Sequence, residues 1–465
     1  MVDKGDTIKT DLLARLDRIP WNSWHSYVFA ILFGGVILEG FSISLGGATL
    51  GSLEKAFDLT AFEAILLTPI YLLGALVGSF VMGSLSDIAG RKKIFIVTVI
   101  IVIIGSIIVA VSFNYGSLIL GRIVTAIGAE GEVAVANTAL SEFVEPKRRG
   151  FVVASGNATA FDVGTFAASL VGFYAITLLP ADIGWRVAFS SAIILGLIVF
   201  FARLKLPESV RYLVRNKRFK EAEKIVSGIE AGYEKSTGKK LPPVTPEILA
   251  FSTQSAAQKY GYVFKKYPKQ IGLAVTLNLT EVWPYYAAFS VIPAILIKFF
   301  KFSSSESSLS LIYITLAGVA GIIVMSLALD RIGRRKTITI SYGIAALMWL
   351  ITGLVSSVVS IAFFIVLLVI LYFWVYAAAG VLYPQISEMF PTSVRNTAVG
   401  TAIGIGRIGG IIGIVVLAAI LNEGVLVVFA ITAAVMAVGA IAEFLVGPET
   451  SHKPLEVTSM EETSK

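Results

Sequence analysis

The chain has 465 residues, of which 56% are hydrophobic and only 15% are charged, and its formal net charge is +7. A soluble domain needs about 25% charged residues to cover its surface, so this composition excludes a water-soluble enzyme. The Lys and Arg residues lie in connectors between apolar runs, where they orient a membrane protein, so no nucleic-acid partner is expected. The chain has no cysteine, and both His25 and His452 lie outside the apolar runs, so we expect no disulfide, metal site or cofactor.

The apolar residues come in runs of about twenty, each long enough to cross a ~30 Å hydrocarbon core. No cleavable signal precedes the first run, so it should stay in the protein as a helix. We predict an all-α membrane protein with twelve transmembrane helices, near 27–50, 62–85, 94–113, 116–142, 151–178, 185–204, 269–299, 307–329, 337–357, 360–388, 396–421 and 425–446. The predicted domains are an N-terminal segment 1–26, a bundle 27–204, a linker 205–268 with a helix near 219–229, a second bundle 269–447 and a tail 448–465.

The orientation follows from the basic residues of alternate connectors. Clusters such as Arg91 to Lys93, Lys147 to Arg149 and Arg334 to Lys336 fall on the same side as the basic linker. Basic connectors face the cytoplasm, so both termini are expected there, in a multi-pass protein of the cell membrane. Lys55, Lys298 and Lys301 lie on the opposite side and are exceptions to the pattern.

Three features of the first half recur in order in the second half. The run Asp87 to Lys93 matches Asp330 to Lys336, and Ser141-Glu142 with Arg149 matches Ser387-Glu388 with Arg395. Leu206 to Ser209 matches Gly447 to Thr450. Two parallel six-helix repeats place a substrate site near the midplane, between the halves.

At these residues the chain resembles the major facilitator superfamily, whose signature Gly-x-x-x-Asp-x-x-Gly-Arg-[Arg/Lys]-[Arg/Lys] is present here from Gly83 to Lys93. The second copy departs at its first position, where Ser326 stands. Arg122, the run Pro207 to Leu213 and the run Pro448 to Thr450 resemble the branch that holds metabolite:proton symporters, sugar porters and organic-ion transporters. The resemblance implies transport by rocker-switch alternating access.

The paired loops have two interpretations. They are either ordinary topology charges or a latch in which Asp87 caps a helix end while Gly90 allows a tight turn. The resemblance implies that four pairs hold the cytoplasmic gate closed: Asp87 with Arg91, Glu142 with Arg149, Asp330 with Arg334, and Glu388 with Arg395.

Ionisable residues inside apolar helices are functional candidates, because a charge at bilayer depth costs at least ~2.5 kcal/mol. Glu39 begins an Glu-Gly-Phe-Ser run that resembles the Asp-Gly-Phe-Asp of aromatic-acid:proton symporters, with Ser42 in place of the second acid. Arg122 resembles the helix-four arginine that pairs with a helix-one acid in proton-coupled relatives, and the alternative is a structural tie near the helix end. Glu130 and Glu132 point to different faces of their helix, and we expect Glu130 to face the cavity and Glu132 to be structural.

Two further charged residues lie in the middle of apolar helices. We predict that Asp162 carries the coupling proton, and the alternative is a neutral acid in a structural hydrogen bond. Arg407 resembles the Arg-x-Gly-Gly arginine of organic-anion and nicotinate-type transporters, which implies recognition of an anion. A guanidinium matches a carboxylate through two parallel hydrogen bonds, but Arg407 could instead form an ion pair with one of the acids.

The seventh predicted helix combines an acid with aromatic residues. Sugar porters carry paired glutamines and an asparagine here, whereas this chain has Val275, Thr276 and Glu281, which counts against a hexose. Glu281 is therefore a candidate substrate contact. Aromatic residues could form a wall for a planar substrate or simply pack between helices; these are Trp283, Tyr285, Tyr286 and Trp374.

We therefore predict a monomeric secondary transporter, not an enzyme, that moves a small organic anion together with protons. The alternatives are a transporter of organic cations or sugars, a drug-efflux antiporter, and a membrane sensor that binds a nutrient without moving it. The choice between anion and cation depends on whether Arg407 is paired or free.

Overall fold

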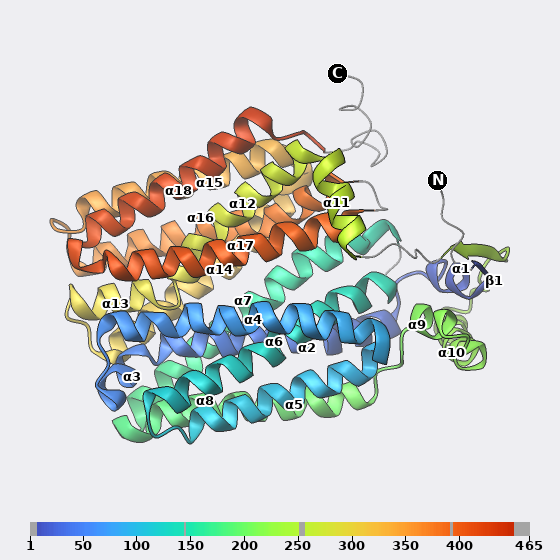
Figure 1. Cartoon of the computed structure of the whole chain (residues 1–465), viewed down its shortest axis with the longest axis horizontal. Coiled ribbons are helices and arrows are strands. Elements are labelled where there is room, and N and C mark those ends of the chain that lie inside the picture. The colour runs from blue at the N-terminus through green and yellow to red at the C-terminus, as the bar shows by residue number, and fades with distance from the viewer. Residues whose placement is uncertain (1–6, 144–145, 251–255, 391–393, 451–465) are drawn as a thin grey trace.

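The computed structural model describes residues 7–143, 146–250, 256–390 and 394–450. Long helices form two halves that lie side by side (Figure 1). The first half comprises α2 (Ser23–Ala48), α3 (Leu50–Phe57), α4 (Ala61–Ala89), α5 (Arg91–Ala110), α6 (Tyr115–Phe143), α7 (Pro146–Leu178) and α8 (Ala181–Leu204). The second comprises α12 (Pro268–Ala287), α13 (Val291–Lys298), α14 (Ser304–Ile332), α15 (Arg334–Val355), α16 (Ile361–Glu388), α17 (Arg395–Ala419), the 3₁₀ turn η1 (Leu421–Glu423) and α18 (Val425–Val446).

Each of the twelve predicted runs corresponds to a helix or, in one case, to a pair of helices. The run predicted over 269–299 is broken into α12 and α13. Pro293 has no backbone N–H, so it cannot bond to the carbonyl of Phe289 four residues earlier, and the helix stops short of this carbonyl. The break lies between Ala287 and Val291 and bears on a contact between the two halves described below.

Eleven helices within the described residues are long and apolar enough to cross a membrane. The α6 helix is not among them, although its 29 residues are ample for a span. Its charged side chains Arg122, Glu130 and Glu132 lower its hydropathy, and all three are buried inside the bundle. The α6 helix therefore carries three of the charged side chains that are buried inside the protein.

Glu132 belongs to a polar cluster within the first half. Its carboxylate forms an ion pair with Arg203 of α8 and accepts a hydrogen bond of 2.7 Å from the Thr98 hydroxyl of α5. Both charged side chains have no exposed area. The cluster joins three helices of one half, which agrees with the structural role predicted for Glu132.

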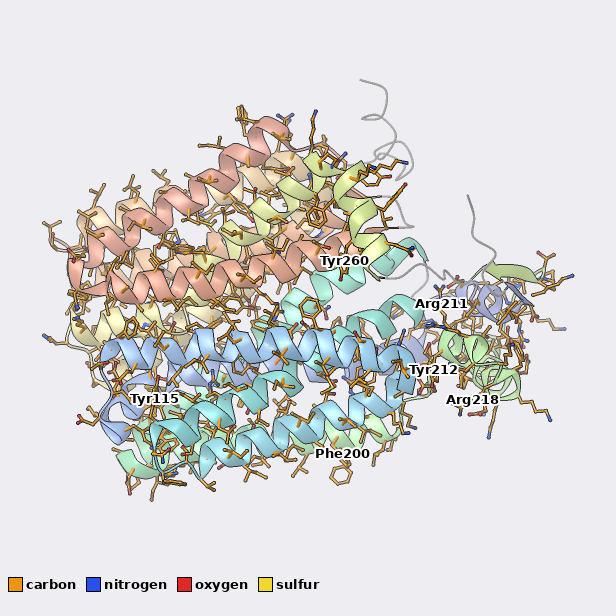
Figure 2. The ribbon with its side chains drawn as sticks, in the orientation of Figure 1. Tyr115, Phe200, Arg211, Tyr212, Arg218 and Tyr260 are labelled. Atoms are coloured by element: carbon orange, nitrogen blue, oxygen red, sulfur yellow. The ribbon has the colours of Figure 1, made fainter. Side chains whose placement is uncertain are left out.

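A polar assembly covers one end of the bundle, which we call the linker end. It contains β1 (Thr7–Thr10), α1 (Leu12–Asp17), α9 (Val210–Arg215), α10 (Phe219–Thr237), β2 (Glu247–Ala250) and α11 (Ala256–Lys266). The described chain begins with β1 and ends after α18 at this end, whereas α3 and α13 mark the opposite, distal end (Figure 1). Figure 2 shows Arg211, Tyr212 and Arg218 grouped at the linker end, while Phe200 of α8 points outward from the bundle.

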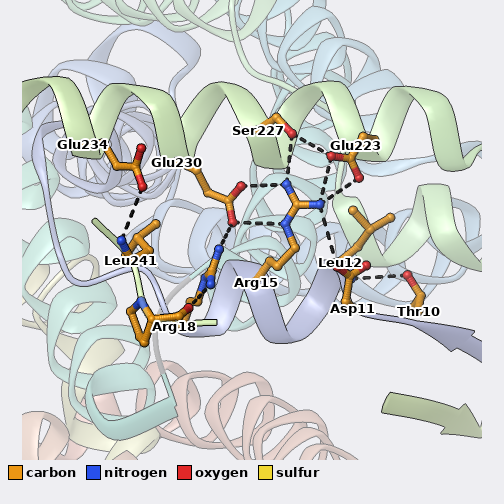
Figure 3. A network of polar contacts seen from close by, with 11 residues as sticks. Thr10, Asp11, Leu12, Arg15, Arg18, Glu223, Ser227, Glu230, Glu234 and Leu241 are labelled. Carbon is orange, nitrogen blue, oxygen red and sulfur yellow. Dashed lines mark hydrogen bonds and ion pairs between the residues drawn. The ribbon is translucent and has the colours of Figure 1, made fainter. Parts of the chain in front are cut away.

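The N-terminal segment is tied to the linker. Strand β1 pairs antiparallel with β2, with Thr7 opposite Ala250 and Thr10 opposite Glu247. Arg15 of α1 forms ion pairs with Glu223 and Glu230 of α10, at 2.9 and 2.6 Å (Figure 3). The predicted helix near 219–229 is present as part of α10, whereas the pairing of β1 with β2 was not predicted.

The two repeated loops have the same construction. Gly90 and Gly333 take φ values of 96° and 95° in the one-residue breaks that follow α4 and α14. The carboxylate of Glu208 accepts a hydrogen bond of 2.9 Å from the Arg91 amide, and Glu449 accepts one of 2.9 Å from the Arg334 amide. A Cβ atom on either glycine would lie about 2.5 Å from the nearby glutamate, so glycine is required both by its φ and by the space.

We expect the Glu132 cluster to show the penalty of an unpaired buried charge. Arg203→Leu leaves Glu132 without its cation and should destabilise the folded protein by about 3 to 5 kcal/mol. The double variant Glu132→Gln/Arg203→Leu removes both charges and should recover much of this loss. Thermal unfolding in detergent compares them, and equal melting temperatures for the single and double variants would contradict the assignment.

The contact between α1 and α10 should depend on pH. Burial raises the pKa of Glu230, but hydrogen bonds and charges from Arg15 and Arg18 outweigh it and hold this pKa below its ordinary value. The stabilisation that this contact contributes is complete above the ordinary glutamate pKa of about 4.3. It is lost as the pH falls through the lower pKa that Glu230 has in the folded protein.

Hydrogen exchange at neutral pH measures this contact. Glu230→Gln should increase exchange in residues 7–18. The control is Glu234→Gln on the same helix, because the Glu234 carboxylate accepts a bond from the Leu241 amide and contacts neither arginine. Equal exchange in the two variants would show that Glu230 does not hold the segment.

Candidate transport site

Charged groups from both halves meet inside the bundle, far from either polar end. The buried acids are Glu39 of α2, Glu130 of α6, Asp162 of α7 and Glu281 of α12, each at most 4% exposed. Arg407 of α17 joins them, with 13% of its side chain exposed. Sequence analysis selected all five residues, and the structure gathers them into two groups.

The first group consists of Glu39, Glu130 and Arg407. Glu130 of the first half forms an ion pair with Arg407 of the second half. Glu39 lies within electrostatic reach of both Glu130 and Arg407. This group therefore places two acids beside one cation. Of the two predicted roles of Arg407, the structure contains the ion pair.

Arg122 does not pair with Glu39, contrary to the pairing that the family resemblance implies. Its guanidinium donates to the backbone carbonyls of Ser42 at 2.6 Å and Ile43 at 3.3 Å. It also lies over the Tyr71 ring, 4.5 Å from the ring centre. Gly46 makes this position possible, because a Cβ atom there would lie 2.9 Å from an Arg122 nitrogen. Arg122 therefore connects α6 to the backbone of α2, which corresponds to the alternative of a structural role.

The second group is built around Asp162. Its Oδ1 accepts a hydrogen bond of 2.5 Å from the hydroxyl of Tyr285 on α12, whereas its Oδ2 is buried without a partner. Close packing of α7 on α2 places this acid, since a Cβ atom on Gly164 would lie 2.8 Å from the amide nitrogen of Phe41. Glu281 lies within electrostatic reach of Asp162. This second group also joins the two halves.

The aromatic residues of α12 divide between the two groups. Tyr286 lies within electrostatic reach of Arg407, Glu39 and Glu130, whereas Tyr285 contacts Asp162. Trp283 packs over Gly413 of α17, so it fills a contact between helices of one half. Trp374 is partly buried beside Phe373, and its predicted role as part of an aromatic wall stays a prediction.

Tyr376 of α16 belongs to the second group and was not selected from the sequence. Its ring centre is 4.6 Å from that of Tyr285, and its side chain is fully buried. In the sequence it is a tyrosine in the middle of an apolar run, one helical turn from other aromatic residues. The same pattern occurs where helices simply pack together, so it did not mark Tyr376 as functional. Among the described residues, no group of three or more His, Asp or Glu is placed to hold a metal ion.

The predicted gate is only partly within the described side chains. Glu388 forms an ion pair with Arg334 at 3.1 Å and accepts a hydrogen bond of 2.6 Å from Thr450. Arg91 donates to the Ser86 hydroxyl at 3.3 Å. The other gate side chains lie outside the described residues: Asp87, Glu142, Arg149, Asp330 and Arg395. Their pairing stays a prediction.

The two halves touch closely at the distal end. A Cβ atom on Gly47 of α2 would overlap the Phe289 carbonyl, which lies at the break between α12 and α13. One turn further on, a Cβ atom on Gly51 would lie 2.7 Å from the hydroxyl oxygen of Ser304. Glycine therefore lets the two halves approach closely at this end.

Comparison with known families agrees with this architecture. The family model described as "Sugar (and other) transporter" matches residues 27–461. The chain belongs to this family of the major facilitator superfamily. It is therefore a multi-pass membrane transporter of the secondary type, and the family contains transporters and not enzymes, as predicted.

Individual relatives match over almost their whole length. The Niacin transporter NiaP of Acinetobacter baylyi is 27% identical over 96% of this chain and 99% of its own. A putative metabolite transport protein of Escherichia coli, YdjK, is 30% identical over 96% of this chain and 97% of its own. A partially occluded inward-open structure of the xylose transporter XylE from E. coli has a TM-score of 0.74 at 17% identity, covering 93% and 100% of the two chains. This last likeness concerns the fold.

The distal contact yields a prediction about conformation. Gly47→Ala should disfavour the closed distal end, because the new methyl group overlaps the Phe289 carbonyl. Ser290→Cys is a suitable reporter, because Ser290 is fully buried next to this carbonyl and the chain has no other cysteine. The Gly47→Ala change should make this cysteine react several-fold faster with a water-soluble maleimide.

Gly34→Ala is the matched control on the same helix. Its Cβ would meet only Val199 of the same half, at an ordinary 3.4 Å. Labelling that is equally slow with both alanine variants would show that Gly47 does not govern closure.

Proposed function

We propose that this protein couples the movement of protons to the transport of a small organic anion with a carboxylate group. The two halves rock about the central groups, so that the site opens alternately to the distal end and to the linker end. Following the distribution of basic residues, the linker end and both termini lie in the cytoplasm.

The observation that carries this proposal is the ion pair between Glu130 and Arg407. It joins the two halves at the site, and a second acid, Glu39, lies within electrostatic reach of the same carboxylate. In the proposed mechanism a proton neutralises Glu130 and releases Arg407. The freed guanidinium can then bind a substrate carboxylate through two parallel hydrogen bonds.

This exchange links the proton to the substrate. In a low-dielectric interior Arg407 needs an anionic partner, which is either ionised Glu130 or the carboxylate of a substrate. Substrate without a proton would leave an excess negative charge, and a proton without substrate would leave Arg407 unpaired. The site therefore favours the two together, which is the requirement for symport.

The comparisons support the carboxylate. One relative is named a niacin transporter, and niacin is an aromatic carboxylic acid. A hexose is disfavoured because Val275 and Thr276 cannot present the paired amides of the sugar porters. The aromatic side chains of Tyr285 and Tyr286, 5.4 Å apart between ring centres, suit a planar or apolar body attached to the carboxylate.

Uptake into liposomes tests the proposal. With the outside acidic, purified protein should accumulate radiolabelled benzoate or nicotinate. Arg407→Ala should abolish uptake, while Glu130→Gln should retain exchange of substrate across the membrane but lose accumulation driven by the proton gradient. Arg186→Ala is the control, because this arginine lies over Trp185 and donates to the Ala110 carbonyl, away from the site.

The outcomes separate the alternatives. Uptake of organic cations or sugars without uptake of any carboxylate would reject the proposal. Binding without flux would identify a sensor, and accumulation with the gradient reversed would identify an efflux antiporter.

A further inference from the structure

The group around Asp162 contains two acids, and no cation is paired with them in the described part of the chain. Both Asp162 and Glu281 are buried, and within the described part of the chain neither carboxylate is paired with Lys, Arg or His. Two carboxylates that share a dry interior cannot both stay ionised without a cation. The Glu130 group differs in this respect, because Arg407 neutralises it from the other half.

Aromatic rings surround this acidic group. The Tyr285 ring lies 4.6 Å from Tyr376 and 6.0 Å from both Phe161 and Phe289, measured between ring centres. Ring faces attract a cation through their quadrupole, most strongly where water is excluded. Aromatic rings arranged around carboxylates are a recurring solution for binding an alkylated ammonium group.

Polar atoms without partners point to a ligand at the same place. Asp162 Oδ2 has no hydrogen-bond partner, and the buried Tyr376 hydroxyl has no well-formed one. Tyr376 lies within electrostatic reach of both Asp162 and Glu281. Buried polar atoms are normally satisfied, so this group is suited to a ligand that brings positive charge.

The two groups lie beside neighbouring side chains of α12. Tyr285 donates a hydrogen bond to Asp162, and Tyr286 lies within electrostatic reach of Arg407. Tyr383 lies within electrostatic reach of both Glu281 and Arg407. A ligand the size of a single substituted ring can therefore reach both.

We propose that Asp162, Glu281, Tyr285 and Tyr376 form a subsite for a positively charged nitrogen, so that the transported substrate is a zwitterion whose carboxylate binds Arg407. This assignment rests on the carboxylate transport proposed above and narrows its substrate class. The cationic end draws Asp162 of the first half toward Glu281 and Tyr376 of the second, while the anionic end replaces Glu130 at Arg407. One molecule thus bridges the halves at both groups.

Three ring compounds of similar size test the assignment with the purified full-length protein. Benzoate has the carboxylate alone, N-methylpyridinium has the cation alone, and N-methylpyridinium-3-carboxylate has both. Binding is measured by calorimetry in detergent. The zwitterion should bind about tenfold or more tightly than benzoate, as expected for a desolvated cation among aromatic rings and carboxylates.

Variants locate the effect. Asp162→Asn and, independently, Glu281→Gln should remove the advantage of the zwitterion, so that each variant binds the zwitterion and benzoate within about twofold of each other, a difference of under 0.5 kcal/mol. Arg407→Ala should weaken benzoate and the zwitterion alike. Glu423→Gln, an exposed acid in the turn before α18, is the control and should change neither.

Three results would overturn the assignment. In the first, benzoate binds as tightly as the zwitterion, which would leave protons as the occupants of Asp162 and Glu281. In the second, sodium chloride stabilises the protein more than potassium chloride, and Asp162→Asn removes the difference, which would identify an inorganic cation. In the third, Asp162→Asn weakens every ligand equally, which would indicate a structural role. If no carboxylate binds at all, the proposed function itself fails, and binding of N-methylpyridinium still tests the subsite.

Discussion

A charge inside a bilayer must be neutralised by something at the same depth, and this requirement organises the whole molecule. The protein meets it in two ways. Glu132 and Arg203 neutralise each other within one half, with Thr98 completing the cluster, so their pairing need not change when the halves move. Glu130 and Arg407 neutralise each other across the halves, so their pairing must change whenever the halves separate. An ion pair between glutamate and arginine is therefore a fixed contact within the first half and, in the proposed mechanism, an exchangeable contact between the two halves.

In the function proposed above, a proton takes the place of Arg407 at Glu130, and a substrate carboxylate takes the place of Glu130 at Arg407. The Asp162 group offers a second contact between the halves through the hydroxyl of Tyr285. Glycine determines where the halves close, since Gly47 allows α2 to reach the Phe289 carbonyl that Pro293 leaves without an intrahelical partner. The close contact at Gly47 and the ion pair between Glu130 and Arg407 therefore both bear on the proposed movement of the two halves.

The sequence predicted the architecture well because membrane helices have a strong and simple signal: length, apolarity and basic connectors. It also selected Glu39, Glu130, Asp162, Glu281 and Arg407, since the cost of burying charge makes each of them conspicuous. Which groups these charged side chains contact was harder to predict. Arg122 was matched to Glu39 by resemblance, whereas the structure gives it backbone carbonyls of α2, because helix rotation decides which groups meet and a single sequence does not determine rotation. Tyr376 and the pairing of β1 with β2 went unpredicted for the same reason, since both depend on segments far apart in the chain.

In the proposed function, the substrate carboxylate and a proton bind together at the Glu130–Arg407 pair. The most direct test is calorimetric titration of the purified protein with a carboxylate, in several buffers of different ionisation enthalpy, which counts the protons bound with the ligand. We expect the protein to take up about one proton for each carboxylate that it binds near neutral pH, and we expect Glu130→Gln to lose this uptake. Carboxylate binding with no proton uptake in the unmodified protein would contradict it.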